Sequence, residues 1–315
     1  MFEVRQLSKT FGALTAVDQV SFRVQEGQTL ALIGTSGSGK TTILKMLNRL
    51  IEPTDGAILL NDENIRDKPI IELRRQMGYV IQDTGLFPHY TIAENIGLVP
   101  GLLGWDKKDT RQRIYKLMER LALAPDIYAD KYPHQLSGGQ QQRAGIARAL
   151  AANPPIILMD EPFGALDPIT RKDIRREFAE LDELANKTTI LVTHDVEEAF
   201  EMADLICVLD HGRVQQLGTP REILFAPTND FVRDFVQDKR TQLQLQQIRL
   251  ADLTGAATSQ IATPEKKGQG DLTVQEAIDL MLQQGCDQIT TELAGQTYTF
   301  TFAQLMEGLQ NQQQA

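Results

Sequence analysis

The sequence predicts an α/β fold with a mostly parallel sheet, followed by a small α+β unit. Short apolar runs rich in β-branched residues lie at 156–159, 189–192 and 205–209, and helical patterns separate them. This alternation is typical of a parallel sheet covered by helices. A glycine-rich turn also lies between an apolar run at 29–33 and a helical pattern at 41–50. That position places the turn at the carboxyl end of a strand.

The remaining elements of the first 235 or so residues follow from their hydrophobic periodicity. Residues 2–7 and 20–24 alternate apolar and polar side chains, as half-buried strands do, and 77–81 is a short buried-strand candidate. Ile114, Leu117, Met118 and Leu121 mark one face of a helix from about 109 to 124. These elements extend the alternation of strands and helices over the first 235 or so residues.

The composition changes near Lys239 and predicts a second domain. Residues 241–270 are rich in Gln, Thr, Ala and Gly, which indicates either a linker or the poorly patterned start of a small domain. Thr273 and Glu276 then form a capping signature for a helix that Gly285 would end, and 289–293 and 297–302 are candidate paired strands. We expect one domain at 1–238, a linker at 239–248 and a C-terminal unit at 249–315.

Composition excludes several classes of protein. The 315 residues suffice for about two domains, and 42% hydrophobic content argues against global disorder. The formal net charge of -10 weighs against nucleic-acid binding, and two cysteines exclude a disulfide scaffold or a paired-cysteine zinc site. No segment approaches the ~18–20 continuous apolar residues of a membrane span, and the N-terminus lacks an apolar signal core. We expect a chain that does not cross a membrane but could dock on a membrane protein.

The glycine-rich turn fits the phosphate-loop pattern of nucleotide-binding proteins without a mismatch. Its glycines let successive backbone N–H groups face one anion, and the following helix adds its positive end. Lys40 would neutralise the β- and γ-phosphates, and the Thr41 hydroxyl would bind Mg²⁺. The alternative is a turn without function. The position between a strand and a helix, which the motif requires, favours the phosphate loop. The residues expected to bind ATP here are Gly34, Thr35, Ser36, Gly37, Ser38, Gly39, Lys40, Thr41 and Thr42.

The apolar run at 156–159 ends in two carboxylates, Asp160 and Glu161. An acidic pair after a strand is usually a helix cap or a surface loop. Beside a phosphate loop, it indicates nucleotide chemistry instead. We expect Asp160 to hold Mg²⁺, through water, and Glu161 to polarise the attacking water.

A second glycine turn lies about twenty residues before these carboxylates. It consists of Ser137, Gly138, Gly139 and Gln140 and precedes a helical pattern at 141–151. Such a turn would direct a helix N-terminus toward a phosphate. Alone it means little, but its spacing to the acidic strand is the most discriminating pattern in the chain.

The phosphate loop, the turn at 137–140 and the acidic pair at 160–161, in their order along the chain, resemble the ATP-binding-cassette family over residues 1–238. The resemblance implies a phosphate-loop NTPase core sheet with an antiparallel β subdomain and a helical subdomain. It also implies functional roles for single residues that would otherwise be interpreted as core, surface or structural residues. Phe11 would stack on adenine rather than pack in the core, and Val17 would add an apolar wall. Gln82 would contact Mg²⁺ and the transport partner, Asp167 would help dimer contact, and His194 would touch the γ-phosphate.

The resemblance implies that two copies of the chain bury two ATP molecules between them. One copy would supply the phosphate loop and the catalytic residues, and the other would supply the turn at 137–140. ATP would draw the copies together, and hydrolysis would let them part. The expected catalytic set is Glu161, His194, Gln82 and Lys40, and the expected Mg²⁺ set is Thr41, Gln82 and Asp160.

Further stretches resemble one kind of cassette protein. A single phosphate loop without long heptad runs resembles the separate ATPase subunit of a bacterial transporter. Residues 99–105, 132–135 and 161–168 resemble importers of glycine betaine, choline, carnitine and related quaternary-amine osmoprotectants. Leu86, Phe87 and Ile92 would form a groove for the permease, unless they are core residues of the helical subdomain. The alternatives are an importer of amino acids or polyamines, or an ATP-gated clamp without a transport role.

This resemblance implies a peripheral ATPase on the cytoplasmic face of the cell membrane. Its partners would be a second copy of itself, transmembrane permease subunits and an extracytoplasmic substrate-binding protein, with no nucleic acid. The C-terminal residues 249–310 resemble one unit of the cystathionine-β-synthase (CBS) type, which occurs as a regulatory tail of osmoprotectant importers. Those relatives usually carry two units, so a single unit would need to pair between subunits. A small dimerisation or packing tail is the alternative.

Overall fold

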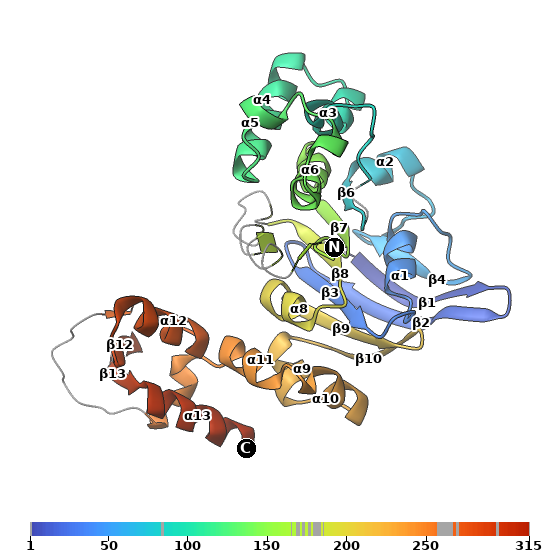
Figure 1. Cartoon of the computed structure of the whole chain (residues 1–315). Coiled ribbons are helices and arrows are strands. Elements are labelled where there is room, and N and C mark those ends of the chain that lie inside the picture. Colours follow the sequence, from blue (N-terminus) through green and yellow to red (C-terminus); the bar gives the residue numbers. More distant parts are fainter. Residues whose placement is uncertain are drawn as a thin grey trace. The chain divides into compact units, whose positions relative to one another are not determined.

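The computed structural model describes residues 2–82, 85–164, 166–167, 171, 174–175, 178, 184, 186–256, 267–268, 271–293 and 296–314. The chain divides into two compact units, which are Met1–Ile223 with Pro227–Val232, and Leu224–Ala226 with Arg233–Ala315. Figure 1 follows the chain through these units. Within the described ranges, no helix combines the length and apolar character that crossing a membrane requires.

A six-stranded sheet forms the centre of the first unit. Its strands are β3 (Thr29–Gly34), β6 (Met77–Val80), β7 (Ile156–Asp160), β8 (Thr188–Val192), β9 (Leu205–Asp210) and β10 (Arg213–Gly218). Their order is β10-β9-β3-β8-β7-β6. Every pair is parallel except β9 with β10, so the predicted mostly parallel sheet is confirmed.

The two faces of this sheet belong to two different cores, because successive strand residues point to opposite sides. In β7, Ile156 and Leu158 face one core, whereas Ile157 and Met159 face the other. The first core also contains helix α1 (Lys40–Leu47) and a second, antiparallel sheet of order β2-β1-β4-β5. The strands of that sheet are β1 (Phe2–Phe11), β2 (Leu14–Val24), β4 (Asp55–Leu60) and β5 (Glu63–Asn64), and α2 (Ile70–Arg75) follows it.

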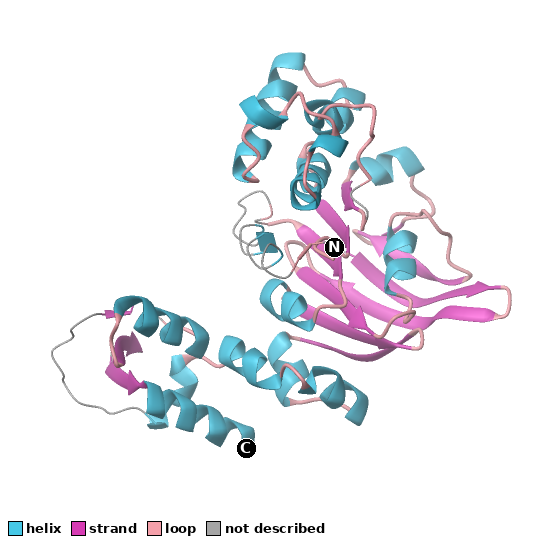
Figure 2. Ribbon diagram, in the orientation of Figure 1, coloured by secondary structure: helices cyan, strands magenta, loops and turns pink. Residues whose placement is uncertain are grey.

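The other core joins the sheet to a helical layer, which is grouped around α6 in Figures 1 and 2. The layer contains α3 (Ile92–Leu102), α4 (Lys107–Arg120), α5 (Pro125–Tyr128), the 3-10 helix η1 (Pro133–Gln135) and α6 (Gly138–Leu150). The predicted stripe of Ile114, Leu117, Met118 and Leu121 is buried there. Buried Asn95 donates to the carbonyls of residues 87, 90 and 91, which fixes the approach to α3.

The second unit is a small α+β structure. Its elements are α11 (Arg240–Gln247), η2 (Leu250–Ala256), β11 (Lys267–Gly268), α12 (Val274–Gln284), β12 (Gln288–Leu293), β13 (Gln296–Thr301) and α13 (Phe302–Gln314). The helices α9 (Pro220–Phe225) and α10 (Asp230–Gln237) contain residues of both units. The predicted strands do pair, and they run antiparallel, while β11 pairs with β12.

The caps of α12 agree with the sequence prediction. Thr273 and Glu276 form a reciprocal capping box, and Gly285 ends the helix in the left-handed conformation with φ of 61°. The segment 239–248, predicted as a linker, contains helix α11. Leu243 is fully buried on that helix, and this burial stabilises the helix. The boundary between the two domains at residue 238 stays a prediction.

Candidate active site

The phosphate loop and three candidate residues follow neighbouring strands of the parallel sheet. The phosphate loop follows β3, His194 lies two residues after β8, Glu161 follows β7, and Gln82 lies two residues after β6. These strands are adjacent in the order β3-β8-β7-β6 and parallel, so their carboxyl ends lie at one edge. Such an edge is where open α/β sheets place their ligand sites.

The phosphate loop is so closely surrounded by backbone that two of its glycines cannot be replaced. A Cβ on Gly34 would lie 1.9 Å from the carbonyl oxygen of Leu209, and one on Gly39 would lie 2.4 Å from that of Ala16. Both glycines also have positive φ, of 145° and 95°. The neighbouring strands β2 and β9 therefore hold the loop in its curled shape.

Lys40 is anchored inside this loop, with only 7% of its surface exposed. Its Nζ donates to the carbonyls of Gly34 at 3.0 Å and Thr35 at 2.8 Å, and to Ser38 Oγ at 3.2 Å. Burial lowers the pKa of Lys40, and the carboxylates of Glu161 and Asp160 oppose this shift. The loop thus holds a desolvated cation where an anion would stabilise it.

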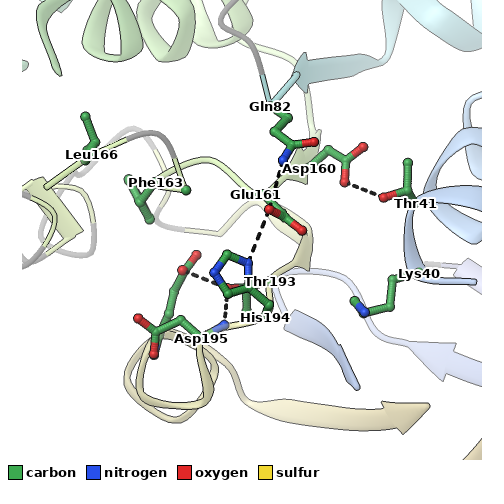
Figure 3. A network of polar contacts seen from close by, with 12 residues as sticks. Lys40, Thr41, Gln82, Asp160, Glu161, Phe163, Leu166, Thr193, His194 and Asp195 are labelled. Carbon is green, nitrogen blue, oxygen red and sulfur yellow. Dashed lines mark hydrogen bonds and ion pairs between the residues drawn. The ribbon is translucent and has the colours of Figure 1, made fainter. Parts of the chain in front are cut away.

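Thr41 and Asp160 bring two hard oxygen donors together, as Figure 3 shows. The Thr41 hydroxyl donates to Asp160 Oδ1 at 2.9 Å. Burial raises the pKa of Asp160, while the hydrogen bond from Thr41 lowers it. The described residues contain no group of three or more His, Cys, Asp or Glu side chains suited to a metal ion. The hydroxyl of Thr41 and the carboxylate of Asp160 are hard oxygen donors that fit Mg²⁺, which proteins often bind through one or two carboxylates together with substrate phosphates.

Glu161 receives two polar side chains from neighbouring strands (Figure 3). Gln82 Nε2 donates to Glu161 Oε2 at 3.0 Å, and His194 Nδ1 lies 3.2 Å from the same oxygen. The backbone of Glu161 has φ of 46°, a left-handed conformation that non-glycine residues rarely adopt. A hydrogen bond from its N–H to the carbonyl of Val192, at 2.9 Å, holds this conformation. Strain of this kind clusters at functional sites.

A pocket of about 520 Å³ opens over the phosphate loop. Its lining residues are Ala16, Ser36, Gly37, Ser38, Gly39, Lys40, Thr41, Thr42, Glu161 and His194. None of the described residues that line it comes from 137–140. Ser137 instead caps α6, where its Oγ and the Gln140 side chain form a capping box, so that the helix begins at Gly138 and not at 141. The second glycine turn therefore does not complete the pocket of its own chain.

Several predicted residues lie outside this pocket. Phe11 is 47% exposed at the end of β1, which rules out the alternative of core packing. Val17 is fully buried beneath Gly39, and its role as an apolar wall of the nucleotide site stays a prediction. Ile92 is also fully buried and belongs to the helical core, whereas Phe87 is 41% exposed. Asp167 lies in the loop after Glu161.

The sequence did not identify several residues that hold the site. Asp210, at the end of β9, accepts a hydrogen bond from Thr35 Oγ1 at 2.8 Å. Asp195 caps helix α8 (Val196–Met202), and a capping signature before that helical pattern could have revealed it. Arg171 donates to backbone carbonyls, which leave no trace in a sequence pattern.

Comparisons with known proteins agree with this geometry. A sequence model of the family described as ABC transporter matches residues 17–164. The chain is 47% identical to the glycine betaine/carnitine/choline transport ATP-binding protein OpuCA of Bacillus subtilis, over 92% of this chain and 74% of that protein. The chain belongs to the ABC transporter family. The predicted resemblance is thereby confirmed.

Other ABC transporter proteins show the same relationship. The glycine betaine uptake system ATP-binding protein YehX of Escherichia coli is 45% identical over 91% of this chain and 92% of its own length. A dimeric structure of a bacterial ABC transporter cassette has a TM-score of 0.63 at 34% identity, and covers 70% of this chain and 98% of that one. A dimeric post-hydrolysis cassette bound to ADP and Pi gives a TM-score of 0.62 at 34% identity, with the same coverage of both chains.

Proposed function

We propose that this chain is the ATPase subunit of an importer for quaternary-amine osmoprotectants of the glycine betaine, choline and carnitine type. The ATPase activity is supported by the position of Glu161, which lines the pocket over the phosphate loop and contacts Gln82 and His194. The substrate class is supported by relatives at 44–47% identity that are named for the transport of glycine betaine, carnitine or choline.

In this proposal, hydrolysis uses side chains that line the pocket or contact it. The loop N–H groups and Lys40 bind the phosphates of ATP, which is the substrate. Glu161 accepts the proton of the attacking water, and Gln82 and His194 orient its carboxylate. Thr41 and Asp160, with Gln82 beside them, would hold Mg²⁺, which neutralises phosphate charge when it is bound.

A second copy of the chain completes the nucleotide site. The turn at 137–140 lies outside its own chain's pocket, and solved cassettes of the family form dimers. A Cβ on Gly138 would meet nothing within 4 Å, so the amino end of α6 is open to a phosphate carried by a partner. Asp167 contributes to the contact between the two copies.

The permease would dock in a groove next to Gln82. This groove, of about 370 Å³, is lined among others by Ile81, Phe87 and Leu98. Arg148, on α6, also lines it and donates to the carbonyl of Gly85 at 2.5 Å. A contact in this groove would therefore reach both the glutamine and the helix that begins with the second glycine turn. The subunit would sit on the cytoplasmic face of the membrane, with a substrate-binding protein on the other side.

The C-terminal residues 249–315 form a CBS-like unit in this proposal. The antiparallel pair β12–β13 and the helices α12 and α13 share one apolar core, which supports a small independent unit. The unit regulates the ATPase or pairs the two copies.

The proposal is tested with the full chain, its permease subunits and their binding protein in membranes. We expect glycine betaine, choline or carnitine to stimulate ATP hydrolysis, and Lys40→Ala to abolish the stimulation. Stimulation by an amino acid or a polyamine alone would contradict the substrate class. ATPase activity in a complex that never co-purifies with a membrane protein would contradict the transport role.

A further inference from the structure

A single guanidinium holds the backbone that follows Glu161. Arg171 Nε donates to the carbonyl of Phe163 at 3.2 Å, and its Nη2 donates to those of Gly164 at 3.3 Å and Leu166 at 2.9 Å. The ring of Phe163 is fully buried against Phe178, with 5.6 Å between ring centroids. The carbonyls of Phe163, Gly164 and Leu166 are thus held by Arg171, and the Phe163 side chain is held by its burial.

The same guanidinium reaches the turn that carries His194. Arg171 Nη1 lies 3.8 Å from Asp195 Oδ2, directly after the histidine. Asp195 Oδ1 accepts the N–H groups of residues 197 and 198 at the start of α8. The N–H of Asp195 donates to Thr193 Oγ1 at 3.0 Å, and this hydroxyl donates to buried Glu198 at 2.9 Å. Asp195 therefore fixes the turn that contains His194 and also pairs with the Arg171 guanidinium.

These contacts close a ring around the catalytic carboxylate. Glu161 is followed in the chain by Phe163, Gly164 and Leu166, whose carbonyls accept hydrogen bonds from Arg171. Arg171 also contacts Asp195, which directly follows His194. His194 Nδ1 then returns to Glu161 Oε2 at 3.2 Å. Within the ring, the N–H of Gly164 also donates to the carbonyl of Glu161 at 3.1 Å. A shift of the loop after Glu161 would therefore move the histidine that contacts Glu161.

We propose that Arg171 is a positioning residue for ATP hydrolysis, acting through Asp195 to hold His194 against Glu161. This inference rests on the proposed ATPase function. Arginine suits the role because its planar group presents five N–H donors in a fixed fork, which serve several carbonyls and a carboxylate at once. Lysine would keep the charge but not this geometry. Arg175 Nη1 also lies 3.8 Å from Asp195 Oδ2, and its Nε is 2.5 Å from Glu201.

The test compares steady-state hydrolysis and ATP binding of the full chain in single and double variants. Asp195→Asn removes the charge but keeps an oxygen that caps α8, since asparagine caps helices as well as aspartate does. We expect Arg171→Gln, Arg171→Lys and Asp195→Asn each to lower kcat by about 10- to 100-fold, as displaced catalytic groups do. ATP affinity should stay within about twofold, and the Arg171→Gln/Asp195→Asn double variant should be no slower than the slower single variant.

An exposed pair provides the matched control. Arg5 donates to Glu3 at 2.8 and 2.9 Å on β1, away from the pocket, so Arg5→Gln and Glu3→Gln should keep wild-type kcat. Unchanged kcat in Asp195→Asn, full activity of Arg171→Lys, or losses that multiply in the double variant would each overturn the proposal. If Arg171→Gln does not fold, Asp195→Asn decides alone. Wild-type protein without ATPase activity would instead contradict the proposed function.

Discussion

Replacing buried Glu198 by glutamine should change how the stability of the first unit depends on pH. Glu198 lies at 2% exposure and accepts a hydrogen bond from Thr193. Burial raises its pKa from 4.5 to about 8, a shift that Asp195 strengthens and that Thr193, Arg175 and Arg171 oppose. Between pH 4.5 and about 8, Glu198 is therefore protonated in the folded state, whereas in the unfolded state it has lost this proton.

The sign and size of the effect follow from this difference in pKa. The contribution of Glu198 is full below pH 4.5 and falls as pH rises, by about 1.4 kcal/mol per pH unit, until it levels off near the folded pKa. Between pH 5 and 7 the loss is about 3 kcal/mol. Glu198→Gln has no proton to lose, and its amide oxygen can still accept from Thr193. The stability of the variant relative to wild type should therefore increase over this range.

Urea unfolding can measure this, followed by the fluorescence of Trp105, the single tryptophan of the chain, which lies in the same unit. Glu72→Gln on α2 is the matched control, because Glu72 lies in solvent, and should follow wild type at every pH. A stability difference between Glu198→Gln and wild type that stays constant from pH 5 to 8 would refute the reasoning.

Three further predictions concern the nucleotide pocket. Glu161→Gln should bind ATP but hydrolyse it about 10²–10⁴-fold more slowly, and unchanged turnover would remove Glu161 from the role of base. Lys40→Ala should weaken ATP binding in a direct titration, and wild-type affinity would contradict the phosphate-loop assignment. Gly39→Ala should also lose ATP binding, because its Cβ would lie 2.4 Å from the carbonyl oxygen of Ala16. Gly101→Ala, whose Cβ meets nothing within 4 Å, should bind normally, and equal losses in both variants would count against the steric argument.

Local patterns were enough to predict the framework of the first unit and the capping of α12. The alternation of side chains in 156–159 and the glycines of the phosphate loop are features of neighbouring residues, so the sequence displays them directly. The resemblance to the ATP-binding-cassette family implied that Lys40, Glu161 and His194 share one site, and all three line the pocket over the phosphate loop.

What the sequence missed depends on contacts between distant residues. The left-handed backbone of Glu161 is held by the carbonyl of Val192, and Arg171 acts on backbone atoms, so neither has a pattern of its own. Helix α11 lies where composition left a linker and the start of a small domain as alternatives, and the burial of Leu243 that stabilises this helix depends on the fold.

The most direct test of the account is a crystal structure of Glu161→Gln with ATP. We expect two copies with two nucleotides between them, in which Ser137 and Gly138 of one copy contact the γ-phosphate bound by Lys40 of the other. A γ-phosphate whose oxygens are all bound within one chain, without any contact from a second copy, would contradict it.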